Sequence, residues 1–133
     1  MTKKVYTFGY SGKDTADLDR LVDDLGAVVF DVRFSPRSRN PHWNRRALEA
    51  LLGDRYRHVR ALGNANYRGG PIEIVDLEEG VRTIQASPQP VILMCVCKDP
   101  RICHRTTIAD HLRALGFDVE ELDERPPLQM RLL

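Results

Sequence analysis

The sequence of 133 residues contains no apolar stretch of the roughly 18 residues that a membrane-spanning helix needs. Its first residues also lack the apolar run of a secretory signal peptide, and no linker, internal repeat or low-complexity segment interrupts it. The 20 basic and 19 acidic residues leave a formal net charge of +1, so the chain as a whole has no attraction for nucleic acid or anionic membranes. We therefore expect a cytoplasmic protein without membrane contact, in which any affinity for anions comes from a local patch.

Cysteine is absent from most of the chain, because all three cysteines lie between Cys95 and Cys103. An odd and clustered set is a poor disulfide framework. It is typical of a reducing compartment, where clustered thiols bind metal or do chemistry.

Apolar runs that alternate with helical periodicity fill the rest of the chain, and 42% of the residues are hydrophobic, which is enough for a core. The pattern predicts strands at 5–8, 27–32, 56–59, 91–96 and 118–122, and helices at 15–25, 44–52, 74–86 and 103–115. This alternation predicts a single α/β domain over residues 1–133, a three-layer α/β/α fold with a mostly parallel sheet of about five strands. In such sheets ligands bind beyond the carboxyl ends of the strands.

One candidate site residue, Cys103, closes the loop that leaves the fourth predicted strand and begins the last predicted helix. A thiol at a helix start faces unpaired N–H groups and the positive end of the helix dipole, so Cys103 is a candidate nucleophile and His104 a candidate acid or base. Arg105 is a candidate anion ligand. The alternative is that Cys95 and Cys97 are small buried residues at the end of the strand and that Cys103 only fills space at the helix start.

A zinc site is a further alternative for Cys95, Cys97, Cys103 and His104, which are all soft ligands. Their spacing differs from that of two separated ligand pairs, and adjacent Cys and His side chains rarely reach one ion. We therefore assign no metal and no cofactor.

The loop after the second predicted strand is strongly basic, with five arginines and no acidic residue from Arg33 to Arg46. Arginine forks, the Ser38 hydroxyl and the Trp43 ring are the groups that recognise phosphate and nucleic acid, with Trp43 as a stacking plane. The alternative is a solvated loop that Trp43 anchors to the core.

Asp31 and Arg33 lie at the end of a buried strand, where charged side chains need partners. They either organise the site or form a structural ion pair, and we place Asp31 with Cys103 and His104 in the catalytic group. Ser11, in a Gly-rich turn after the first strand, is a candidate ligand-binding residue. His42, His58 and His111 are interpreted as surface residues, and the Gly- and Asn-rich segment 62–70 as a candidate flap.

Several short motifs follow one another over most of the chain. They are Thr7-Phe8-Gly9-Tyr10-Ser11, Asp31-Val32-Arg33 followed by Pro36 and Ser38, Asn40-Pro41-His42-Trp43, Leu62-Gly63, and Cys95 with Pro100 and Cys103-His104-Arg105 before Ile108-Ala109. In this order they resemble the uncharacterised family known as domain of unknown function 488. The resemblance implies an α/β fold and no established activity.

Two positions depart from that family's usual pattern. Tyr10 stands where the family usually has His, which removes a possible acid or base, and Cys97 stands where it usually has an acidic residue, which weakens the zinc interpretation. The Asp-Val-Arg strand end and the cysteine loop are also faintly similar to rhodanese-type domains, by analogy only.

Three classes of function follow. The leading hypothesis is a protein that binds a phosphate-bearing ligand, a nucleotide or nucleic acid, and acts on it as an enzyme through Cys103 and His104, with Arg33, Ser38, Arg105 and Ser11 holding the anion. The alternatives are a non-catalytic nucleic-acid-binding module and a thiol-based redox or sulfur-handling protein.

Overall fold

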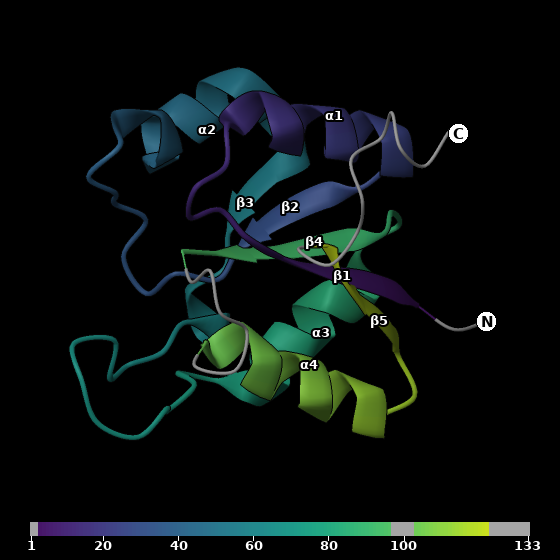
Figure 1. Ribbon diagram of the computed structural model, residues 1–133. Helices are drawn as coiled ribbons and strands as arrows, with labels where there is room; N and C mark the ends of the chain where they lie inside the picture. Colours follow the sequence, from purple (N-terminus) through teal and green to yellow (C-terminus); the bar gives the residue numbers. More distant parts are fainter. Residues whose placement is uncertain (1–2, 97–102, 123–133) are drawn as a thin grey trace.

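Five strands form one sheet at the centre of the computed structural model, which describes residues 3–96 and 103–122 (Figure 1). The strands are β1 (Lys4–Gly9), β2 (Val28–Asp31), β3 (Tyr56–His58), β4 (Val91–Cys95) and β5 (Asp118–Glu121). They lie in the order β3-β2-β4-β1-β5, and every neighbouring pair is parallel. The predicted parallel sheet is therefore confirmed.

Helices cover both faces of this sheet (Figure 1). The described ranges hold α1 (Thr15–Leu25) and α2 (Arg45–Leu52) on one face, and α3 (Leu77–Ala86) and α4 (His104–Ala114) on the other. Short 3-10 helices at Pro41–Trp43, Gly53–Arg55 and Arg60–Leu62 lie in the connections. The three-layer α/β/α architecture is confirmed, and no helix in the described part of the chain is long and apolar enough to cross a membrane.

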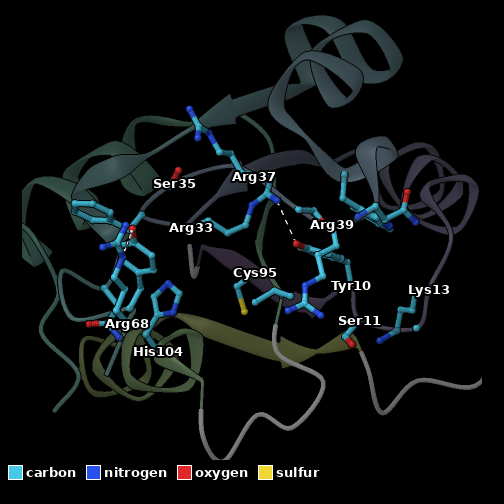
Figure 2. A pocket seen from close by; sticks show the side chains of 18 of the residues that line it. Tyr10, Ser11, Lys13, Arg33, Ser35, Arg37, Arg39, Arg68, Cys95 and His104 are labelled. Atoms are coloured by element: carbon cyan, nitrogen blue, oxygen red, sulfur yellow. Dashed lines mark hydrogen bonds between the residues drawn. The ribbon is translucent and has the colours of Figure 1, made fainter. Parts of the chain in front are cut away.

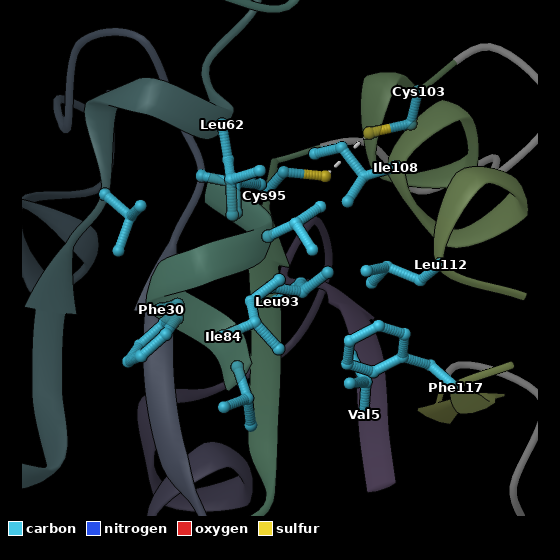
Figure 3. Close-up of a cluster of buried hydrophobic side chains, with 14 residues drawn as sticks. Val5, Phe30, Leu62, Ile84, Leu93, Cys95, Cys103, Ile108, Leu112 and Phe117 are labelled. Carbon is cyan, nitrogen blue, oxygen red and sulfur yellow. Dashed lines mark hydrogen bonds between the residues drawn. The ribbon is translucent and has the colours of Figure 1, made fainter. Parts of the chain in front are cut away.

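The central strand β4 shows why the sequence forms these layers, because all five of its residues are buried. Alternate side chains on a strand point to opposite faces, so Leu93 and Cys95 join the core under α3 and α4 while Met94 joins the core under α1 and α2. Figure 3 shows the first of these cores. A near-continuous apolar run is what a strand covered on both faces requires.

One predicted boundary is wrong, since α3 begins at Leu77 rather than at Ile74. The Asp76 side chain accepts a hydrogen bond of 3.2 Å from the Glu79 amide and caps the helix there. Ile74 instead forms an isolated antiparallel bridge with Asn64, so it belongs to the loop that follows β3.

The connections create a topological switch point between β1 and β4. The chain leaves β1 through α1 and passes β4 to reach β2, whereas it leaves β4 through α4 and passes β1 to reach β5. The connections of these two neighbouring strands therefore run in opposite directions. In open α/β sheets such a switch point opens a crevice outside the carboxyl ends of the strands.

Candidate functional site

A cleft with a volume of about 1000 Å³ lies at this switch point (Figure 2). Its lining follows the ends of four strands: residues 10–14 after β1, 33–35, 37–40 and 43 after β2, 64, 67 and 68 after β3, and 95–96 at the end of β4, together with His104 of α4. The hydrogen bonds from Tyr10 N to Cys95 O and from Ser11 N to Val96 O continue the β1–β4 ladder into the cleft wall, at 2.9 and 3.2 Å.

The cleft is strongly basic although the chain as a whole is nearly neutral. Among the residues that the structure describes, one carboxylate, Asp14, lines it. The cationic side chains of the lining are Lys13, Arg33, Arg37, Arg39 and Arg68. A hollow lined by one sign of charge concentrates ions of the opposite sign, so the electrostatics of this cleft favour anions.

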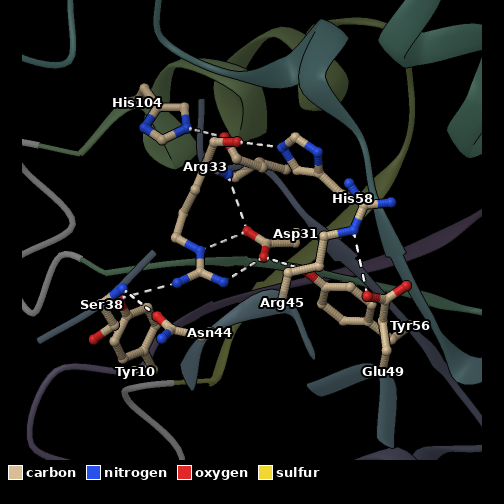
Figure 4. A network of polar contacts seen from close by, with 11 residues as sticks. Tyr10, Asp31, Arg33, Ser38, Asn44, Arg45, Glu49, Tyr56, His58 and His104 are labelled. Atoms are coloured by element: carbon tan, nitrogen blue, oxygen red, sulfur yellow. Dashed lines mark hydrogen bonds and ion pairs between the residues drawn. The ribbon is translucent and has the colours of Figure 1, made fainter. Parts of the chain in front are cut away.

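The deepest of these cations, Arg33, is held by a buried carboxylate (Figure 4). Asp31 is fully buried and accepts three hydrogen bonds from Arg33: from Nε at 2.8 Å, from Nη2 at 2.5 Å and from the backbone amide at 3.1 Å. The Tyr56 hydroxyl donates to the same carboxylate at 2.5 Å. The remaining guanidinium nitrogen, Nη1, donates to the Tyr10 hydroxyl at 3.3 Å and turns that side of Arg33 toward the cleft.

Burial and charge have opposite effects on this cluster. Burial alone would lower the pKa of Arg33, but the hydrogen bonds and the negative charge of Asp31 outweigh it and raise the pKa above its ordinary value. Burial and the nearby Asp31 carboxylate both raise the pKa of Tyr56, which therefore stays a donor. Asp31 does not line the cleft, and its oxygens are occupied, so in this geometry it positions Arg33.

Two histidines fix the backbone on either side of Arg33 (Figure 4). His104 Nε2 lies 2.7 Å from Val32 O, and His58 Nε2 lies 2.7 Å from Arg33 O. A carbonyl oxygen can only accept, so each Nε2 carries the hydrogen and each Nδ1 is left with a lone pair. The interpretation of His58 as a surface residue is therefore wrong, because it is half-buried and has a structural partner. His104 lines the cleft.

The arginine-bearing loop, residues 33–46, is anchored by the buried side chains of Arg33 and Trp43 and is exposed at positions between them. Trp43 is 2% exposed and stacks on the Tyr10 ring, with centroids 4.5 Å apart, so it anchors the loop and offers no stacking plane to a ligand. The Ser38 amide donates to Asn44 Oδ1 at 2.6 Å. Arg37 and Arg39 lie on the exposed part of the loop and line the cleft.

The cysteines lie deeper than their predicted roles suggest. Cys103 is the N-cap of α4, as predicted, but its side chain is 2% exposed and packs in the core. Its sulfur lies 2.6 Å from that of Cys95, and of these two described cysteines Cys95 lines the cleft (Figures 2 and 3). Cys97 lies outside the described residues. Within the described ranges, no group of three or more His, Cys, Asp or Glu side chains is arranged to hold a metal ion.

Arg105 also has a different place from the one predicted. It is fully buried and does not line the cleft: Nη1 donates to Cys95 Sγ at 3.2 Å and Nε to Glu121 at 3.3 Å. Burial would lower the pKa of Arg105, but the neighbouring Cys95, Cys103 and Glu121 raise it. Its guanidinium charge therefore acts on the Cys95 sulfur from beneath the cleft.

The lining includes residues that were not among the predicted site residues, and Lys13, Phe34, Tyr67 and Arg68 are examples. Lys13 and Phe34 follow strands that end at the cleft, so strand-end position was an available signal. Tyr67 and Arg68 belong to the segment interpreted as a flap, and only the folding of the loop after β3 brings them to the cleft. Predicted residues Ser11, Arg33, Ser38 and His104 all line the same cleft.

The fold and the cleft define a three-layer α/β protein with a basic cleft at the carboxyl edge of its sheet. A family model described as "Domain of unknown function DUF488" matches residues 16–69, which include α1 from its second residue, β2 and the arginine-bearing loop. The match confirms the resemblance that the motifs indicate. Neither curated proteins nor solved structures gave a significant match.

We expect the replacement Asp31→Asn to lower the free energy of unfolding by about 3–5 kcal/mol, because it leaves the buried Arg33 charge without a negative partner. Tyr56→Phe, which removes one hydrogen bond, should cost about 1–2 kcal/mol. Urea unfolding measures both. The control Arg45→Gln removes an exposed ion pair with Glu49 and should change stability by less than about 0.5 kcal/mol. A cost of Asp31→Asn no larger than that of the control would contradict this account.

Proposed function

We propose that the cleft binds a phosphate-bearing ligand, a nucleotide or nucleic acid. The observation that carries the proposal is the charge of the lining: among the residues that the structure describes, five cationic side chains accompany one carboxylate, in a protein of net charge +1. Arginine is suited to this ligand because its planar fork donates two parallel hydrogen bonds to phosphate oxygens and never loses its charge.

The side chains of the cleft divide into fixed and adaptable groups. Arg33 is fixed by Asp31 and loses little conformational freedom on binding, so it suits the central contact to a phosphate. Arg37 and Arg39, on the exposed loop, can follow ligands of different shape. The Ser11 and Ser38 hydroxyls, which belong to the same lining, add neutral donors.

Chemistry on the ligand would use His104. Its Nε2–H is bound to Val32 O, so Nδ1 is the nitrogen that can take up a proton, 4.0 Å from Cys103 Sγ. This arrangement supports an enzyme in which His104 acts as a general base. The competing function is a non-catalytic nucleic-acid-binding module, in which the same cations bind phosphates and no bond is broken.

Thiol-based redox chemistry is a second candidate function, favoured by the contact between Cys95 and Cys103. Neither is disulfide-bonded, and the 2.6 Å between their sulfurs is closer than non-bonded sulfur atoms normally approach. Arg105 favours the thiolate of Cys95, which lines the cleft. With hydrogen peroxide as oxidant, this thiolate would attack a peroxide oxygen and release hydroxide, giving a sulfenic acid. The Cys103 thiol would then attack that sulfur and release water, which leaves a disulfide. We place the protein in the cytoplasm, where glutathione would return the disulfide to two thiols.

For the anion site, we expect Arg37→Gln/Arg39→Gln to weaken binding of inorganic pyrophosphate roughly 10- to 100-fold, because two charge-assisted contacts are lost. Isothermal titration calorimetry at low salt measures this effect. The matched control, Arg45→Gln/Arg46→Gln, removes the same charge from residues outside the lining and should weaken binding less than about two-fold. Equal losses in both variants would mean that total charge, not the cleft, attracts the anion.

For the enzyme hypothesis, His104→Gln keeps an amide donor for Val32 O but has no basic nitrogen. Phosphate release from nucleoside triphosphates should fall roughly 100- to 10,000-fold, while pyrophosphate binding stays within about two-fold of the parent. Turnover that persists in this variant would exclude His104 as the base. Salt-dependent binding without turnover in the parent would identify a binding module.

For the thiol pair, a Cys97→Ser variant retains Cys95 and Cys103 as its two cysteines. Hydrogen peroxide should remove both thiols together, with a mass loss of two hydrogen atoms that dithiothreitol reverses. In the control Cys97→Ser/Cys103→Ser, Cys95 should instead gain one oxygen and react with dimedone. Two titratable thiols after peroxide treatment would rule out this function.

A further inference from the structure

The rim of the cleft carries an aromatic surface that the phosphate contacts do not use. Tyr67 is 50% exposed, and its ring stacks on that of Phe34 with centroids 5.2 Å apart and an interplanar angle of 21°. Both residues line the cleft. A half-exposed aromatic ring in a cleft that also holds cationic side chains is a surface on which a base can stack.

Phe34 is fixed from two sides. On one side, the guanidinium carbon of Arg60 lies 4.3 Å from the Phe34 ring centroid. Arg60 itself does not line the cleft. Gly63 packs so closely that a Cβ there would lie 2.9 Å from the Phe34 Cα, which real structures do not tolerate. Phe34 therefore has a defined position beneath Tyr67.

The loop that carries Tyr67 is also held in place. Hydrogen bonds from Ala65 N to Glu73 O and from Val75 N to Gly63 O, of 2.7 and 3.0 Å, tie its two arms together, and Tyr67 N donates to Asn64 O at 3.1 Å. Such a loop presents the ring without first having to order itself, which lowers the entropy cost of binding.

The surroundings of Tyr67 select the kind of ring that would stack on it. Arg68 donates from Nε to the Tyr67 hydroxyl at 3.0 Å, and its guanidinium carbon lies 5.4 Å from the ring centroid (Figure 2). Lys13, Arg33, Arg37 and Arg39 share the same cleft. A ligand that fills both regions carries a flat ring and a phosphate on one molecule.

We propose that Tyr67 is a stacking platform for the base of a nucleotide whose phosphate lies among the arginines. This inference rests on the proposed function and narrows its ligand to an unpaired nucleotide, free or within a single strand. A duplex is excluded because its bases already stack on one another and show no open face.

The first experiment compares ligands with and without a base. The parent should bind AMP roughly 5- to 100-fold more tightly than ribose 5-phosphate, which carries the same phosphate. The parent should also bind an eight-nucleotide single strand of thymidines more tightly than an abasic strand of equal length and charge, by a similar factor. A larger difference in affinity between AMP and ribose 5-phosphate identifies a free nucleotide as the natural source of the base. A larger difference between the two oligonucleotides identifies a single strand.

The second experiment replaces the platform. Tyr67→Ala should abolish the preference for AMP over ribose 5-phosphate and leave ribose 5-phosphate binding unchanged, whereas Tyr67→Phe keeps the ring and should keep the preference. The control Ile72→Ala removes another exposed apolar side chain of the same loop, outside the lining, and should have no effect. Melting curves of each variant verify that it is folded.

The outcomes separate this inference from the proposed function. If AMP and ribose 5-phosphate bind the parent equally, or if Tyr67→Ala keeps the preference, the platform is wrong and the phosphate site stands. If neither these ligands nor the two oligonucleotides bind, the proposed function fails and the platform fails with it.

Discussion

A charged arginine can lie 5% exposed at the floor of a cleft only if something nearby carries the opposite charge, and Asp31 does so for Arg33. The same carboxylate accepts a hydrogen bond from the hydroxyl of Tyr56 on β3. Because β3 is also paired with β2, which carries Asp31, the backbone pairing and this side-chain hydrogen bond hold the two strands together. Arg33 in turn contacts Tyr10, which stacks on Trp43 and so anchors the arginine-bearing loop. The walls of the cleft therefore depend on one ion pair.

The sheet topology explains how a nearly neutral chain acquires a basic cleft. Residues that follow β1, β2 and β3 are far apart in sequence, but parallel strands end at one edge, and the switch between β1 and β4 opens space there. Apart from Asp14, the acidic residues in the described part of the chain lie outside the lining, for example Asp118 and Glu120 on β5, where Lys4 pairs with both. Net charge is thus a poor guide to function for this protein, whereas the distribution of charge over strand ends is informative.

The sequence predicts most of the fold because the strands are apolar runs that both layers of helices cover. It predicts the location of Arg33 and His104 because strand-end loops share one edge in a parallel sheet. Side-chain direction is a tertiary property, and there the predictions differ from the structure. Arg105 turns beneath the sheet edge and Tyr67 supplies the exposed ring, whereas Trp43 takes the second of its two expected roles and turns inward to Tyr10 as an anchor. No local pattern distinguishes these orientations, since each depends on packing between distant segments.

The hydrogen bonds of His104 and His58 to neighbouring carbonyl oxygens have a consequence for the floor of the cleft. The carbonyl groups of Val32 and Arg33 flank the Arg33 Cα, and the two histidines tie them to α4 and to β3. A displacement of either element would therefore be transmitted to the backbone that carries Arg33.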